Sequence, residues 1–145
     1  MILTVSFGCW LLGIEADALD QSPFIGAIWE GAVYGELRRR TVALGLNRTF
    51  YYYHDNEGTE VDFLALGDGA RFLEVKWTQY PSVKDGRNLK RLADLAKTGK
   101  SPELQSPSLW VLSRTDQGYP LGPDGDITVV GLDSVTEILT AKRGS

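Results

Sequence analysis

Residues 60–76 read EVDFLALGDGARFLEVK, two apolar runs joined by Gly67-Asp68-Gly69. Charged and apolar residues alternate in both runs, which predicts a β-hairpin with strands at about residues 59–66 and 70–77. The charged residues are expected to share one face of this hairpin: Glu60, Asp62, Glu74 and Lys76. Charged groups within apolar strands are costly to bury unless they are bound or paired. The hairpin is therefore the first place to look for a functional site.

The composition limits the classes of protein that the chain can represent. It has 145 residues, 43% hydrophobic and 23% charged, which fits one soluble globular domain with a substantial core. The net charge of −4 argues against a strongly cationic, non-specific nucleic-acid binder, but an acidic metal site remains compatible with it. The single Cys9 excludes an internal disulfide and suits a reducing compartment, so we expect a cytoplasmic protein. The single His54 excludes a histidine-rich zinc site.

The first 14 residues are mostly apolar. They lack a cationic n-region and are too few to span a bilayer, so we interpret them as a core-packing segment and expect no membrane association. The apolar pattern starts without a polar lead-in, which favours a C-terminal fragment of a longer polypeptide. The alternative is a native N-terminus that packs into the core.

Ser22-Pro23 is typical of a helix start and Gly45 of a helix end, so a long helix is expected between them. Glu30 lies three residues from apolar positions on either side, which directs it towards the buried face. Such a carboxylate is a candidate ligand. The alternative is a partly exposed acid, or one paired with an arginine.

Two further expectations concern the second half of this helix. Glu36 is expected to be solvated. Arg38, Arg39 and Arg40 follow one another along the helix and should point in three directions about 100° apart. They are therefore not expected to form one basic patch.

The rest of the chain alternates strands and helices. A strand is expected at residues 49–53, whose tyrosines 51–53 either lie half-buried in the sheet or stack on bases. Residues 84–97 predict a helix, and one of its faces carries Lys84, Arg87 and Arg91, which either contact phosphates or remain solvated. Buried strands are expected at 109–112 and 127–130, an exposed loop at 116–126 and a closing helix at 133–141.

This order predicts an α/β fold with a mixed central sheet flanked by helices. The core is helix, three antiparallel strands, helix and strand (αβββαβ), followed by an extra C-terminal strand and helix. A helix between the third and fourth strands implies that these strands are parallel, with a right-handed crossover. No internal repeat or linker is evident, so residues 1–145 are interpreted as one domain.

The chemistry follows from the charged residues. Asp62 and Glu74 should lie about 5 Å apart on neighbouring strands, and two such carboxylates repel unless a cation enters. Oxygen ligands favour Mg²⁺ or Mn²⁺, with Glu30 as a further ligand. Lys76 can position a water or stabilise charge on a phosphate under attack. The alternative is a structural network in which Lys76 pairs with Asp62 and Glu74 fixes the strand register.

Together these residues resemble the PD-(D/E)xK restriction-endonuclease-like superfamily. The closer resemblance is to the C-terminal domain, numbered as domain of unknown function 4143, of a family of prokaryotic AAA-type ATPases. It covers about residues 7–115. The motifs that carry it are Leu11-Leu12-Gly13-Ile14, Gly26-x-x-x-Glu30-x-x-x-Tyr34-x-Glu36-Leu37, Tyr52-Tyr53, Gly58-x-Glu60-Val61-Asp62-Phe63 and Glu74-Val75-Lys76.

The resemblance implies a nuclease-like module that follows an ATPase domain and a winged helix. DNA and the ATPase domain of the parent polypeptide, or other subunits, are the partners that it implies. The chain has no Gly-x-x-x-x-Gly-Lys-Ser/Thr loop, so it should not bind ATP. It also has Trp29 where the family usually has phenylalanine, and Val61 where a proline is expected.

Two functional hypotheses follow from the sequence. The first is a metal-dependent deoxyribonuclease or nuclease-like DNA-processing domain, with Asp62, Glu74 and Lys76 as catalytic residues and with Glu30, Asp62 and Glu74 binding Mg²⁺ or Mn²⁺. The second is a non-catalytic interaction or regulatory module of an ATPase, which the acidic net charge favours. A purely structural dimerisation domain is a third, weaker interpretation.

Overall fold

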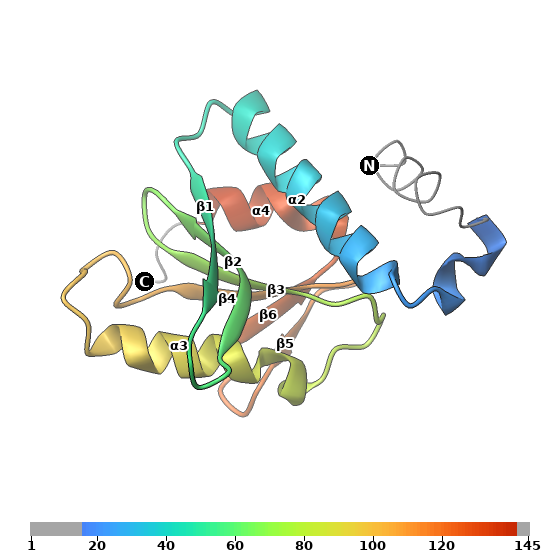
Figure 1. The fold of residues 1–145 in the computed structure, drawn as a ribbon. Coiled ribbons are helices and arrows are strands. Elements are labelled where there is room, and N and C mark those ends of the chain that lie inside the picture. The colour runs from blue at the N-terminus through green and yellow to red at the C-terminus, as the bar shows by residue number, and fades with distance from the viewer. Residues whose placement is uncertain (1–15, 142–145) are drawn as a thin grey trace.

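The computed structural model describes residues 16–141 (Figure 1). The apolar segment at residues 1–14, including Cys9, lies outside the described residues. The elements are, in order, η1 (Ala16–Gln21), α2 (Ile25–Ala43), β1 (Thr49–His54), β2 (Glu60–Leu66), β3 (Arg71–Val75), η2 (Val83–Gly86), α3 (Arg87–Lys97), β4 (Ser108–Leu112), β5 (Tyr119–Leu121), β6 (Ile127–Val130), η3 (Leu132–Ser134) and α4 (Val135–Thr140).

The six strands form one mixed sheet in the order β1-β2-β3-β4-β6-β5. β1, β2 and β3 are antiparallel, whereas β3, β4 and β6 run parallel to one another. The predicted mixed α/β sheet and the parallel pairing after the crossover helix are confirmed. The expected loop at residues 116–126 is partly wrong, because it contains β5, which pairs with β6 at the edge of the sheet.

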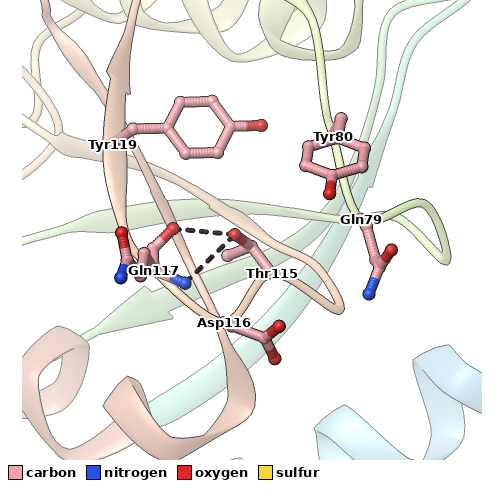
Figure 2. Close-up of a pocket in the computed structure, with 6 residues that line it drawn as sticks. All are labelled: Gln79, Tyr80, Thr115, Asp116, Gln117 and Tyr119. Atoms are coloured by element: carbon pink, nitrogen blue, oxygen red, sulfur yellow. Dashed lines mark hydrogen bonds between the residues drawn. The ribbon is translucent and has the colours of Figure 1, made fainter.

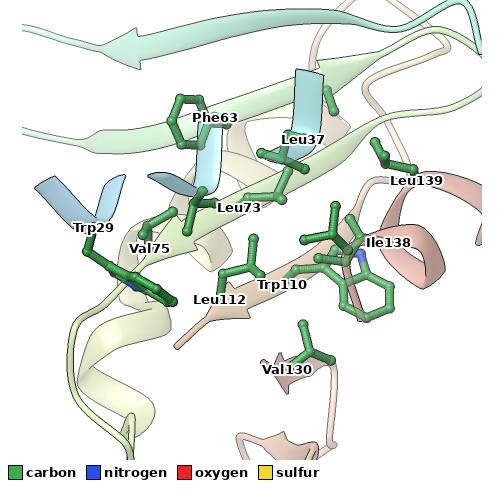
Figure 3. Packing of buried hydrophobic residues seen from close by; sticks show 13 residues of the cluster. Trp29, Leu37, Phe63, Leu73, Val75, Trp110, Leu112, Val130, Ile138 and Leu139 are labelled. Carbon is green, nitrogen blue, oxygen red and sulfur yellow. The ribbon is translucent and has the colours of Figure 1, made fainter. Parts of the chain in front are cut away.

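The helices cover both faces of the sheet. α2 and α4 lie on one face, and α3 lies on the other (Figure 1). Figure 3 shows the core beneath α2 and α4, which includes Trp29, Leu37, Leu73, Trp110, Ile138 and Leu139. The core beneath α3 includes Leu64, Phe72, Leu89, Leu92, Val111 and Ile127. Burial of each such side chain contributes about 1.5–3 kcal/mol relative to exposure, so both faces stabilise the sheet.

The turn between β2 and β3 has the predicted composition and the conformation that the composition implies. Gly67, Asp68 and Gly69 all have positive φ angles, of 107°, 52° and 89°. At Gly67 a Cβ atom would lie 2.1 Å from the Asn47 carbonyl oxygen, so the position requires glycine on two grounds. The turn therefore fixes where β3 begins and which of its residues face β2.

Two buried arginines join this turn to the C-terminal end of α4. Arg71 is 2% exposed, and its guanidinium donates to four backbone carbonyls, those of Asp68, Gly69, Ile138 and Ala141. Arg48 donates to the carbonyls of Asp68 and Leu139, at 3.1 and 2.7 Å. Carbonyls at the end of a helix have no partner within the helix and carry negative partial charge, so the two cations hold α4 against the sheet.

The expectation that Glu36 is solvated is wrong. Glu36 is 6% exposed and accepts hydrogen bonds from Arg39 at 2.6 and 2.8 Å and from Arg40 at 2.7 Å. Arg40 also donates to Thr136 of α4 at 2.6 Å. The physical reason is that α4 covers this part of α2, which the periodicity of α2 alone does not reveal. Two of the three consecutive arginines therefore converge on one carboxylate instead of pointing apart.

This cluster makes stability depend on acid pH. The hydrogen bond from Arg39 lowers the pKa of Glu36 to about 2, burial opposes the shift, and Arg40 adds to it. The stabilisation is therefore present above about pH 4.5 and is lost as the pH falls towards 2. We expect Glu36→Gln to lower the free energy of unfolding at neutral pH by about 1–2 kcal/mol and to flatten its acid dependence.

Urea unfolding across the acid range measures this effect. The exposed Glu137→Gln is the matched control and should leave the curve unchanged. If the free energy of unfolding of Glu36→Gln falls with acid as steeply as that of the wild type, then Glu36 is not the source of the acid dependence.

None of the helices within residues 16–141 combines the length and the hydrophobicity needed to cross a membrane.

Candidate functional site

The candidate site begins at an irregularity in β2. Between the cross-strand pairs Tyr51–Leu64 and Tyr53–Val61, β1 contributes one residue and β2 contributes two. The extra residue makes a β-bulge that contains Asp62. Bulges interrupt the regular alternation of side chains, so Asp62 does not follow the simple two-residue pattern that the sequence suggests.

The pairing of β2 with β3 also ends next to Asp62. Phe63 and Leu73 form the last backbone pair on this side. Beyond it, Asp62 Oδ2 accepts a hydrogen bond from the Val75 backbone N–H at 2.7 Å. The Asp62 side chain therefore lies in the gap where the two strands separate, and it satisfies an amide that the strand pairing has left free.

Glu74 and Lys76 lie at the same end of β3. Glu74 is 4% exposed, and its Oε2 lies 3.3 Å from the Lys76 Nζ. The neighbours Leu73 and Val75 belong to the core beneath α2, so alternation directs Glu74 towards the α3 face. Asp62, which accepts the amide of the next residue, Val75, lies close enough to Glu74 for its charge to act on the Glu74 carboxyl group. The structure thus brings Asp62, Glu74 and Lys76 together.

The electrostatics of this trio follow from its burial. Burial, followed by the charge of Asp62, raises the pKa of Glu74 to about 8, and Lys76 only partly offsets this. Burial lowers the pKa of Lys76, but the charges of Glu74 and Asp62 outweigh it and the net shift is upward. The pKa of Glu74 is thus raised because the carboxyl group is buried beside a second acid, and Lys76 stays charged next to it.

Glu30 lies at the rim of the trio. It is half-buried on α2, and its pKa is raised by burial and then by the charges of Asp62 and Glu60, against the effect of Lys76. A hollow of about 310 Å³ adjoins it, lined by Ala27, Glu30, Gly31, Tyr34 and Phe63. Within residues 16–141, however, no three acidic, histidine or cysteine side chains lie close enough together to bind a metal ion. Glu30, the predicted third ligand, thus lies near Asp62 but does not form a three-ligand group with Asp62 and Glu74.

Tyr52 is a neighbour that the sequence analysis did not assign to the site. Interaction with Glu60, followed by burial and by the charges of Asp62 and Glu30, raises the pKa of Tyr52 to about 12. The tyrosine run suggested only a strand or base stacking. The useful signal would have been that Tyr52 lies two residues before His54, the cross-strand partner of Glu60, and therefore on the same face of the hairpin.

The three predicted phosphate contacts have different surroundings. Lys84 and Arg87 are exposed on η2 and α3. Arg91 forms an ion pair with Glu57 in the turn between β1 and β2. Arg91 is therefore already neutralised, and the predicted basic face is reduced to two exposed cations.

Comparison with known proteins places this geometry in a family. A family model described as a domain of unknown function (DUF4143) matches residues 25–134. The chain belongs to the DUF4143 family. No curated protein and no solved structure matched the chain. The matched range runs from α2 to η3, so all of the candidate site residues lie within the DUF4143 domain, and the resemblance seen in the motifs is confirmed at this level.

The raised pKa of Glu74 predicts a loss of stability with increasing pH. A folded-state pKa above the unfolded value means that the contribution is present below about pH 4.5 and is lost as the pH rises through about 8. Glu74→Gln has no such titration. The free energy of unfolding of the wild type minus that of Glu74→Gln, measured in EDTA, should therefore decrease from about pH 5 to about pH 8.

Urea unfolding of both proteins at the two pH values gives this difference. Glu137→Gln, an exposed change of the same kind, should show a constant difference from the wild type. If the difference in free energy of unfolding between the wild type and Glu74→Gln stays constant or increases with pH, burial does not raise the pKa of Glu74.

Proposed function

We propose that this DUF4143 domain is a divalent-metal-dependent, nuclease-like domain that hydrolyses phosphodiester bonds in DNA. The observation that carries the proposal is the placement of Asp62 beside Glu74 where β2 and β3 separate: Asp62 accepts the Val75 amide at 2.7 Å, and the Lys76 Nζ lies 3.3 Å from Glu74. Two carboxylates and a lysine at the end of neighbouring strands are an expensive arrangement for a structural role alone.

The donor set fits a hard divalent cation. Both carboxyl groups offer oxygen, one of the Asp62 oxygens already accepts the Val75 amide, and a bound cation would favour the ionised form of Glu74, whose pKa is raised by burial. Asp62 and Glu74 would hold Mg²⁺ or Mn²⁺, with Glu30 as a further ligand. When bound, such an ion lowers the pKa of a coordinated water and polarises phosphate oxygens.

The remaining side chains of the site are proposed to act without binding the metal. Lys76 is 38% exposed and carries its charge at the solvent side of the buried Glu74, where it can contact a phosphate oxygen. Tyr52 and Glu60 lie near Glu30 and Asp62, on the β1 side of the site.

The order of elements supports the proposal at the level of fold. α2, β1, β2, β3, α3 and β4 follow the αβββαβ order expected of a restriction-endonuclease-like core. In this proposal β6, β5 and α4 are additions to that core. Fold analogy is weaker evidence than the site itself, so the side-chain geometry carries the argument.

A cleavage assay tests the proposal. Single- and double-stranded DNA is incubated with the domain and Mg²⁺ or Mn²⁺, with EDTA as the metal-free control. Asp62→Asn keeps an oxygen to accept the Val75 amide while removing the charge, so its loss of activity would not result from a lost structural bond. Equal cleavage by the wild type and Asp62→Asn, or cleavage unaffected by EDTA, would end the proposal.

The second candidate function is a non-catalytic interaction or regulatory module for an ATPase domain. The favouring observation is that Glu74 already has a charged partner, the Lys76 Nζ at 3.3 Å, and that no three-ligand group is assembled within residues 16–141. In that case the trio would fix the separation of β2 and β3 without binding a metal. A wild-type domain that folds normally but does not cleave DNA would favour this candidate.

A further inference from the structure

A second hollow lies on the loops that follow β3 and β4. It has a volume of about 390 Å³ and is lined by Gln79, Tyr80, Thr115, Asp116, Gln117 and Tyr119 (Figure 2). In Figure 2, Tyr80 and Tyr119 stand on opposite sides of the hollow, and Thr115 and Asp116 lie between the two loops. A volume in this range suits a small planar ligand.

The two walls of the hollow are held in place by hydrogen bonds between the loops. The Tyr119 hydroxyl donates to the Pro81 carbonyl at 2.9 Å, which fixes its ring. Arg114 donates from its backbone N–H to the Thr78 carbonyl at 3.2 Å and from its Nε to the Trp77 carbonyl at 2.8 Å. The hollow is therefore a built feature of the two loops and not a gap at one loose segment.

The ligand chemistry follows from the lining. Tyr80 is 80% exposed, so one face of its ring is available for stacking. The amides of Gln79 and Gln117 offer both donors and acceptors, and Asp116 accepts from amino groups. An aromatic platform surrounded by groups that can pair with ring nitrogens and amino groups suits a nucleobase.

The hollow lies at the same end of the sheet as the candidate active site, because β3 and β4 run parallel and the two loops follow their C-terminal ends. The loop that carries Gln79 and Tyr80 begins at Lys76, at the end of β3. The carboxylate of Asp85, in the η2 turn, lies close enough to act electrostatically on both Lys76 and Tyr119. A nucleic-acid strand with a phosphate at Lys76 would thus have the hollow within reach of one of its bases.

We infer that this hollow binds an unpaired nucleobase of the strand whose phosphate lies at Lys76, with Tyr80 as the stacking platform. The inference rests on the proposed function for the identity of the ligand as a nucleic-acid strand. It assigns a preference for single-stranded DNA or for a base displaced from a duplex, because a paired base cannot present its faces to a tyrosine.

Binding in the absence of metal tests this inference separately from catalysis. A labelled single-stranded DNA of about 12 nucleotides is titrated with the domain in EDTA, at fixed ionic strength, and followed by fluorescence anisotropy. Tyr80→Ala should raise the Kd by about 5- to 150-fold, whereas Tyr80→Phe should stay within about twofold of the wild type. Tyr51→Ala, which removes a different exposed tyrosine, one that belongs to β1, is the matched control and should have no effect.

Two further binding measurements identify the ligand. An oligonucleotide of the same length made of abasic sites should bind Tyr80→Ala and wild type equally, because it keeps the phosphates and lacks the bases. A free nucleoside monophosphate should not compete at concentrations that match the strand. Complete displacement by the monophosphate, or duplex DNA bound with the same dependence on Tyr80, would overturn the assignment to an unpaired base of a strand.

The outcomes separate this inference from the proposed function. Failure of the wild type to bind the strand, or equal Kd values for wild type and Tyr80→Ala, would overturn the nucleobase site whatever the cleavage assay gives. Binding that depends on Tyr80, found together with no metal-dependent cleavage, would leave the nucleobase site standing and would remove the catalytic proposal alone.

Discussion

Lys76→Met is expected to lower metal-dependent DNA cleavage by at least about 100-fold, the effect typical of removing one group that stabilises charge in a transition state. The same variant should bind Mn²⁺ at least as tightly as the wild type. Lys76 lies 3.3 Å from Glu74, so its removal takes a cation away from the proposed ligands and does not weaken their attraction for a divalent ion. Cleavage rates at saturating Mn²⁺, with the affinity measured separately, test both parts.

Lys97→Met is the matched control, because Lys97 also pairs with a neighbouring carboxylate, that of Asp94, at 2.8 Å on an exposed part of α3. It should cleave at the wild-type rate. A Lys76→Met domain that retains full activity, or one that has lost Mn²⁺ binding together with activity, would contradict the role given to Lys76.

Arg71→Met is expected to lower the free energy of unfolding by about 3–5 kcal/mol, the largest effect on stability that we predict. Methionine keeps the apolar stem of the side chain but removes the guanidinium donor of the Gly69, Ile138 and Ala141 carbonyls, whereas the Asp68 carbonyl keeps its hydrogen bond from Arg48. Each unsatisfied buried group costs about 1–3 kcal/mol, with partial relief as water enters. Because α4 is held at its C-terminal end by these bonds, it should separate from the sheet first.

Urea unfolding at neutral pH measures the loss, and amide hydrogen exchange in α4 locates it. Arg87→Met, an exposed change of the same kind on α3, should alter the free energy of unfolding by less than about 0.5 kcal/mol. An Arg71→Met domain as stable as Arg87→Met would show that the guanidinium is not what holds α4.

The sequence was sufficient for the elements with strong periodicity. α2, β2, β3, α3, β4 and β6 all lie close to where the sequence predicted them. α3 has one apolar face, β3 and β4 are short runs buried on both faces, and α2 is delimited by Ser22-Pro23 and Gly45. β5 was missed because it has only three residues and contains Pro120, and a short strand with a proline has the composition of a loop.

The details of the site depend on contacts that local patterns do not carry. Asp62 is placed by a single extra residue in β2, and bulges leave no clear mark in the alternation of a sequence. Glu36 is buried because Arg40 reaches Thr136, 96 residues further along the chain. The sequence could identify Asp62, Glu74 and Lys76 as unusual, but their contact depends on where β2 and β3 stop pairing.

If Asp62 and Glu74 together bind a divalent cation, calorimetric titration with Mn²⁺ should show one site in the wild type. Binding should be at least about tenfold weaker in Asp62→Asn and unchanged in Asp94→Asn, the same change at an exposed position. Absence of Mn²⁺ binding by the folded wild-type domain, or equal binding by the wild type and Asp62→Asn, would contradict a metal site shared by Asp62 and Glu74.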